Sequence, residues 1–250
     1  MINKRKWFRP VLFGLAACML LPFCMGGCDG QDKSDYEYEI DMEDYLDAIN
    51  ADDEDFLILA NKDKPLGKNY KPDHLDTLDR DLTLDGKKIR LEATAALAVE
   101  ALVLELWECG YDDIRVTSGY RDYDYQKSLF YTYMDNERAS HPDLDDEEIE
   151  EIVLTYSAKP GTSEHQTGLC IDLISTEYKA LDVSFEDNPA FKWLKKNAHH
   201  FGFILRYPEG REDDTGYTYE PWHYRFVGVK AATAIYEGDM ILEDYLRELD

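Results

Sequence analysis

Two short segments of the sequence combine histidines with carboxylates at spacings that suit a metal ion. One reads SEHQTGLCID over residues 163–172, and the other reads EPWHYR over residues 220–225. His165, Asp172 and His223 offer two imidazoles and one carboxylate, the ligand set of a catalytic zinc with an open fourth position. Glu220 is left over, and a carboxylate can take a proton from zinc-activated water and deliver it to a leaving amine. These residues predict metal-assisted hydrolysis.

A third cluster reads SGYR over residues 118–121, with Gln126 shortly after it. An arginine there can grip a carboxylate or a developing oxyanion with two parallel hydrogen bonds. Ser118, Arg121 and Gln126 are therefore candidates for contacting the substrate. Taken singly, each residue has an ordinary structural interpretation, such as a solvated loop histidine or an ion-paired arginine. The combination is what indicates an active site.

Strands and helices are expected to position these clusters. Residues 91–109 carry Ala, Leu and Val at helical spacing and stop at Gly110, which predicts a core helix. Asp122 can cap a helix that runs through Gln126, and residues 145–156 form a helix with an acidic first turn. Strands are predicted over residues 114–118, 169–174, 203–206 and 223–227, a helix over residues 189–200, and two short helices after these. Without regular βαβ alternation, this order favours the α+β class.

The three motifs together resemble the signature blocks of the VanY-type D-alanyl-D-alanine carboxypeptidases, a group that includes the LdcB-like LD-carboxypeptidases. The segment LILANKDKPLGKNYKP also resembles the N-terminal arm of that family, so the resemblance covers about residues 56–250. It implies a compact Hedgehog/DD-peptidase-like domain, in which helices flank a small antiparallel sheet that carries the metal.

The resemblance also implies a role for each site residue. One zinc ion would bind to His165, Asp172 and His223, with Glu220 as the catalytic base and Arg121 on the substrate. The implied reaction removes a terminal D-alanine from peptidoglycan stem peptides, by DD- or LD-cleavage. Cys170 departs from the family pattern, in which a small residue such as Ala is usual, and we expect it to stay outside the chemistry unless it is oxidised.

Composition excludes other classes of function. The 250 residues include 53 acidic and 27 basic side chains, for a formal charge of -26, while 44% are hydrophobic and 13% aromatic. This apolar content can form a core, and the acidic surface repels phosphate backbones. We expect a monomer that binds no nucleic acid.

The N-terminus has the features of an export signal. Residues 1–28 combine a basic start with an apolar run that ends in Gly26, Gly27 and Cys28, which predicts a lipoprotein signal peptide with lipid on Cys28. The alternative is an uncleaved anchor, because the run is near the lower limit for a membrane span. Residues 29–55 are dominated by Asp and Glu and are predicted to form an extended acidic tether. The domain of residues 56–250 would then lie outside the cytoplasm, held at the membrane.

Two cysteines, Cys109 and Cys170, remain beyond the leader, and we expect both to be reduced.

Two rival functions have to be compared with the sequence. A serine peptidase of the penicillin-binding type is excluded because no serine has a lysine three residues later and no Lys-Thr-Gly occurs. A catalytically silent lipoprotein that binds cell-wall peptide is the other alternative, and the presence of Glu220 beside all three candidate ligands argues against it.

Overall fold

The structure is a computed structural model that describes residues 36–249. Contacts group these residues into one unit. The predicted signal peptide, Cys28 and the first seven residues of the predicted tether lie outside the described residues. Within residues 36–249, no helix combines the length and the apolar character needed to cross a membrane.

A four-stranded antiparallel sheet forms the centre of the domain, with the strand order β3-β4-β6-β5. The strands are β3 (Ile114–Ser118), β4 (Cys170–Ser175), β5 (Phe203–Leu205) and β6 (His223–Phe226). Each agrees within a residue or two with the strand predicted from the sequence. All six residues of β4 are buried, because this strand lies in the middle of the sheet with side chains packed on both faces. A separate hairpin pairs β1 (Leu75–Thr77) with β2 (Arg90–Glu92).

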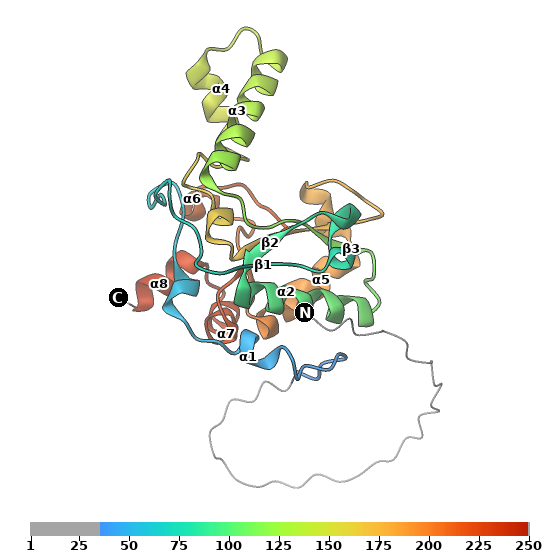
Figure 1. Ribbon diagram of the computed structural model, residues 1–250. Coiled ribbons are helices and arrows are strands. Elements are labelled where there is room, and N and C mark those ends of the chain that lie inside the picture. Colours follow the sequence, from blue (N-terminus) through green and yellow to red (C-terminus); the bar gives the residue numbers. More distant parts are fainter. Residues whose placement is uncertain (1–35, 250) are drawn as a thin grey trace, which may run out of the picture. The chain divides into compact units, whose positions relative to one another are not determined.

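Helices cover the sheet (Figure 1). The longest core helix is α2 (Ala93–Glu108), whose first turn is capped by the Glu92 carboxylate and whose end precedes Gly110 at φ 91°. Nine of its sixteen residues are buried, as its Ala- and Leu-rich sequence predicts. The other helices around the sheet are α1 (Leu46–Ile49), α5 (Pro189–Asn197), α6 (Glu212–Thr215), α7 (Val229–Glu237) and α8 (Leu242–Leu249). The α+β architecture is as expected.

Two helices form an arm that stands out from the rest of the domain (Figure 1). These are α3 (Tyr123–Ser140), capped by Asp122 as predicted, and α4 (Asp146–Val153), which begins with a capping box between Asp145 and Glu148. Their facing sides share a small hydrophobic cluster of their own, made by Phe130, Met134, Ile149 and Val153. The base of this arm, as shown below, forms one wall of the site.

The N-terminal segment of residues 36–55 differs from the expected extended tether, because it packs on the domain. Tyr36, Tyr38, Ile40 and Met42 alternate with acidic residues, so one face of the segment is apolar and lies against the main core. Glu105 on α2 is fully buried and accepts hydrogen bonds from the backbone N–H groups of Glu39 (3.0 Å) and Ile40 (3.1 Å) and from the Tyr36 hydroxyl (3.0 Å). The folded unit therefore begins some twenty residues before the predicted boundary at residue 56.

Replacing Glu105 by alanine is expected to detach this segment. Two backbone N–H groups would lose their acceptor, so the free energy of unfolding should fall by about 2 kcal/mol or more. Chemical denaturation measures this loss, and limited proteolysis should cut the variant within residues 36–55. Glu108→Ala is the matched control, because Glu108 is exposed on the same helix. Equal stability of the two variants would contradict the role given to Glu105.

Candidate metal and active site

Adjacent strands bring the candidate metal ligands together. Asp172 on β4 pairs in register with His223 at the start of β6, and Ser118 at the end of β3 lies opposite Asp172 on the other side. His165 arrives from the short 3-10 helix Glu164–Thr167, which ends at Gly168 in the left-handed conformation at φ 72°. The turn after that helix then feeds directly into β4, which places His165 beside Asp172.

Gly119 fixes the orientation of the His165 ring. A Cβ atom at this position would lie 2.7 Å from Ile89 and 2.8 Å from the Arg90 carbonyl, so only glycine allows so close an approach. The Gly119 carbonyl oxygen lies 2.7 Å from His165 Nδ1. We assign the hydrogen to Nδ1, which leaves a lone pair on Nε2. That lone pair faces Asp172 Oδ2 at 3.3 Å.

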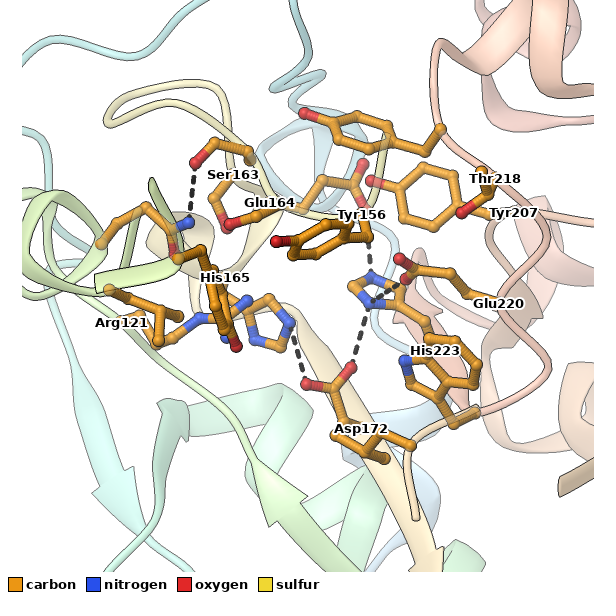
Figure 2. A pocket seen from close by; sticks show the side chains of 18 residues that line it. Arg121, Tyr156, Ser163, Glu164, His165, Asp172, Tyr207, Thr218, Glu220 and His223 are labelled. Carbon is orange, nitrogen blue, oxygen red and sulfur yellow. Dashed lines mark hydrogen bonds and ion pairs between the residues drawn. The ribbon is translucent and has the colours of Figure 1, made fainter. Parts of the chain in front are cut away.

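His223 presents Nδ1 to Asp172, whereas His165 presents Nε2. Its Nε2 faces Glu164 Oε2 at 3.7 Å, so we place the hydrogen on Nε2 and the lone pair on Nδ1. His223 Nδ1 lies 3.1 Å from Asp172 Oδ1, an oxygen that is buried without a hydrogen-bond partner among the described residues. Two imidazole lone pairs and one carboxylate therefore converge (Figure 2). Without a metal, a proton on each ring can occupy these contacts; a metal ion in its place would find two imidazole nitrogens and a carboxylate, a donor set that fits zinc.

Glu164 is a residue of this site that the sequence analysis did not assign. It is fully buried, and its Oε1 accepts hydrogen bonds from Arg206 Nε at 2.8 Å and from Arg225 at 3.0 Å. Burial alone would raise the pKa of Glu164, but the two guanidinium groups hold it below its usual range. An ionised carboxylate beside His223 Nε2 fixes the tautomer that presents Nδ1 to a metal. The signal in the sequence that could have identified Glu164 is its position directly before the candidate ligand His165.

Glu220 stands at the edge of the same group. Its Oε2 lies 3.5 Å from His223 Nδ1, and the side chain is largely buried. Burial raises the pKa of Glu220 to about 7. A carboxylate with such a pKa can both accept and release a proton near neutral pH, which is what a proton shuttle requires.

A cavity of about 310 Å³ opens onto these side chains (Figure 2). His165, Asp172, Glu220 and His223 lie on one part of its wall. The rest includes Leu129 and Tyr133 from the base of the α3–α4 arm, and Tyr156 from the segment after it. The cavity thus joins the candidate metal ligands to a partly aromatic surface large enough for a short peptide end.

The three candidates for substrate recognition have different positions. Arg121 lines the cavity, and its Nε atom is buried without a hydrogen-bond partner among the described residues. Gln126 also lines the cavity; its Nε2 donates to the Ala158 carbonyl at 2.8 Å, while its buried Oε1 has no partner within residues 36–249. Ser118 ends β3 and is not among the residues that line the cavity. A substrate contact by Ser118 stays a prediction.

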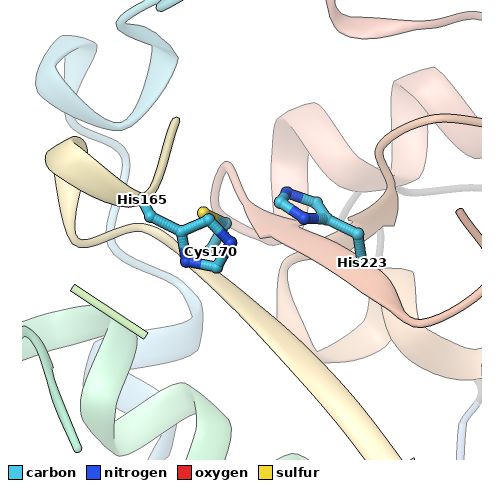
Figure 3. A group of neighbouring side chains, drawn as sticks. All are labelled: His165, Cys170 and His223. Atoms are coloured by element: carbon cyan, nitrogen blue, oxygen red, sulfur yellow. The ribbon is translucent and has the colours of Figure 1, made fainter. Parts of the chain in front are cut away.

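Cys170 lies nearer to the site than the sequence suggested. Its Sγ atom and one ring nitrogen each of His165 and His223 all lie within 4.8 Å of one another (Figure 3). The thiol is fully buried, and both Cys109 and Cys170 are free, which agrees with the expectation of reduced cysteines. The sulfur and two imidazoles thus form one group that could hold a metal ion, and Asp172 contacts each of the two rings through a separate oxygen.

Comparisons with known proteins identify the family of this chain. The profile of the VanY family, described as D-alanyl-D-alanine carboxypeptidase, matches residues 88–229. The protein YodJ of Bacillus subtilis (strain 168) is 38% identical over 225 residues, which cover 87% of this chain and 76% of YodJ. The structure of the LdcB LD-carboxypeptidase superposes with a TM-score of 0.66 at 37% identity, over 77% of this chain and 86% of that one.

A second solved structure carries a metal. The vancomycin-resistance D,D-pentapeptidase VanY of a VanB-type cassette, crystallised in complex with Zn(II), matches with a TM-score of 0.63 at 31% identity, over 77% of this chain and 99% of that one. The family profile spans more than half of the sequence and includes all three motifs. These matches confirm the resemblance and the expected fold, and they show that the chain belongs to the VanY family of D-alanyl-D-alanine carboxypeptidases.

Proposed function

We propose that this protein is a zinc carboxypeptidase that removes the C-terminal D-alanine from peptidoglycan stem peptides. The observation that carries the proposal is the convergence of His165 Nε2, His223 Nδ1 and the Asp172 carboxylate beside a cavity that also contains Glu220 and Arg121. We assign zinc binding to these three ligands. Bound there, zinc would supply Lewis acidity to the scissile carbonyl and to the attacking water.

Glu220 carries the proton in this mechanism. Its carboxylate accepts a proton from the attacking water and returns it to the nitrogen of the departing D-alanine. A pKa of about 7, raised by burial, makes both steps accessible to one group. Glu164 takes no part in proton transfer, because Arg206 and Arg225 keep it ionised.

Arg121 and Gln126 hold the substrate. The buried Nε of Arg121 has no partner among the described residues, so the guanidinium can donate to the terminal carboxylate or to the developing oxyanion. The buried Oε1 of Gln126 can accept a hydrogen bond from a substrate N–H group. Both groups therefore present a polar atom without a protein partner, among the described residues, to a peptide that enters the cavity.

The test is a digestion of defined peptides. Full-length protein, with its zinc content determined by elemental analysis, is incubated with a D-alanine-terminated pentapeptide and with a D-alanine-terminated tetrapeptide. Mass spectrometry should show the loss of one alanine from at least one peptide, and the preferred peptide separates DD- from LD-cleavage. Zinc-loaded protein that shortens neither peptide would favour the catalytically silent alternative.

Exchange of Arg121 for lysine distinguishes a substrate contact from a structural role. Lysine keeps the charge but loses the planar fork, so kcat/KM should fall at least about 10-fold while the melting temperature and zinc content stay the same. Arg138→Lys is the control, because Arg138 pairs with Asp135 and Asp146 on the arm, away from the cavity. Full activity of Arg121→Lys on both peptides would remove Arg121 from the active site.

We also propose that the protein acts outside the cytoplasm as a membrane-anchored lipoprotein. The support is the sequence of residues 1–28 with its basic start, apolar run and Gly26-Gly27-Cys28 ending. Cells fed a labelled fatty acid should incorporate label into the wild-type protein and not into Cys28→Ser. Label in neither protein, together with an intact N-terminus in the membrane fraction, would favour the uncleaved anchor.

A further inference from the structure

Cys170 occupies a place in the metal site that neither zinc hydrolysis nor packing requires. It begins β4, two residues before Asp172, so both side chains lie on the same face of the strand. Figure 3 shows the sulfur beside the His165 ring, with His223 approaching from β6. The Sγ atom and a ring nitrogen of each histidine lie within 4.8 Å of one another.

That spacing is close to what atoms sharing one ion would have. Tetrahedral ligands at zinc–sulfur and zinc–nitrogen distances of about 2.3 and 2.0 Å lie roughly 3.5 Å apart. The sulfur is fully buried and thus shielded from competing solvent. A thiolate is also a softer donor than the water that normally fills the fourth position of a catalytic zinc, and soft ligands favour zinc and heavier thiophilic ions.

A packing role alone explains the position less well. A buried cysteine is often a small apolar filler. Here, however, the thiol lies within 4.8 Å of a ring nitrogen of both His165 and His223, the two imidazoles that also contact Asp172. An alanine would fill the same place without adding a fourth donor.

We propose that Cys170 is a fourth protein ligand to the metal ion, closing the site when no substrate is bound. The S–H bond breaks on metal binding, the proton leaves to solvent, and the sulfur lone pair forms the new bond to the ion. No oxidant or reductant is needed. Substrate or water must then displace the sulfur before hydrolysis. This inference rests on the metal site of the proposed function.

Cobalt spectroscopy tests the ligand directly. Full-length protein reconstituted with Co²⁺ should show a near-ultraviolet sulfur-to-cobalt charge-transfer band, which Cys170→Ala lacks while it still binds Co²⁺. All other cysteines are present in both proteins, so the difference belongs to Cys170. Cys109→Ala is the matched control and should keep the band, because Cys109 lies outside the metal group.

Metal competition gives a second measurement that does not depend on activity. The ratio of Cd²⁺ to Zn²⁺ affinity should fall at least about 10-fold in Cys170→Ala, since loss of a soft ligand should cost no less than loss of an outer-shell partner. Cys170→Ser, which keeps the size of the side chain, should behave like the alanine variant. An unchanged ratio in both variants would overturn the proposal.

The outcomes separate this inference from the proposed function. Wild-type protein that releases D-alanine and binds Co²⁺ without the charge-transfer band would remove Cys170 from the ligand set and leave the function standing. Wild-type protein that shows the band and releases no D-alanine would support the ligand and overturn the function. Protein that binds neither Co²⁺ nor Zn²⁺ would overturn both.

Discussion

Replacing Glu220 by glutamine is expected to reduce kcat/KM by about 10²-fold or more while zinc content and melting temperature stay near those of the wild type. Glutamine has almost the same shape but cannot accept the proton of the attacking water. Glu220 is not one of the three assigned ligands, and its nearest contact to them is the 3.5 Å approach to His223 Nδ1. The measurement is D-alanine release by protein whose metal content has been determined.

A matched carboxylate on the same connection between β5 and β6, on the other side of α6, provides the control for Glu220. Glu209 is exposed and does not line the cavity that holds the candidate ligands, so Glu209→Gln should retain full activity. Near-normal turnover by zinc-loaded Glu220→Gln would require a different base. Loss of zinc from the same variant would instead make Glu220 a ligand.

Replacing His223 by alanine should weaken zinc binding by at least about 100-fold, since even loss of an outer-shell partner can cost 10- to 100-fold. The substitution removes the Nδ1 donor and leaves Asp172 Oδ1 and Glu164 Oε2 without the ring that faces both. Elemental analysis after dialysis against a weak chelator measures the loss. His165→Ala should behave similarly, and Asp172→Ala should also lose zinc because it removes the anionic ligand.

His141→Ala is the control for the histidine variants. His141 is an exposed residue beyond α3 that contacts Glu137, and it should have no effect on metal content. If folded His223→Ala protein still holds one zinc per molecule, then β6 does not provide a metal ligand.

Local signals in the sequence were sufficient to predict the strands and helices that carry the site. The strands predicted over residues 114–118 and 169–174 and the stop signal at Gly110 all lie within a residue or two of observed strand or helix boundaries. The likeness of three motifs to one family then implied that a small antiparallel sheet carries the metal. The hairpin of β1 and β2 was missed, because three-residue strands show too little alternation to be recognised.

Contacts over long sequence distances account for the remaining errors. The acidic composition of residues 36–55 suggested repulsion and extension, yet the alternating Tyr36, Tyr38, Ile40 and Met42 carry enough apolar surface to bind the core. The buried acceptor Glu105 on α2, which binds the N–H groups of Glu39 and Ile40, could not be read from the local pattern. Glu164 was missed for a related reason, because its arginine partners lie 42 and 61 residues away.

The ion pairs behind His223 make the metal site dependent on the C-terminal helix. Arg206 donates to Glu164 and, through two further bonds of 2.9 and 2.6 Å, to both carboxylate oxygens of Glu243 on α8. A protease that clipped the chain before Glu243 would leave Glu164 as the one carboxylate partner of Arg206 among the described residues, while Arg225 would keep its bonds to the carbonyls of Phe56, Ile58 and Phe226. Glu164 would then be drawn away from His223, and the clipped enzyme would lose zinc although every residue of its cleft was intact.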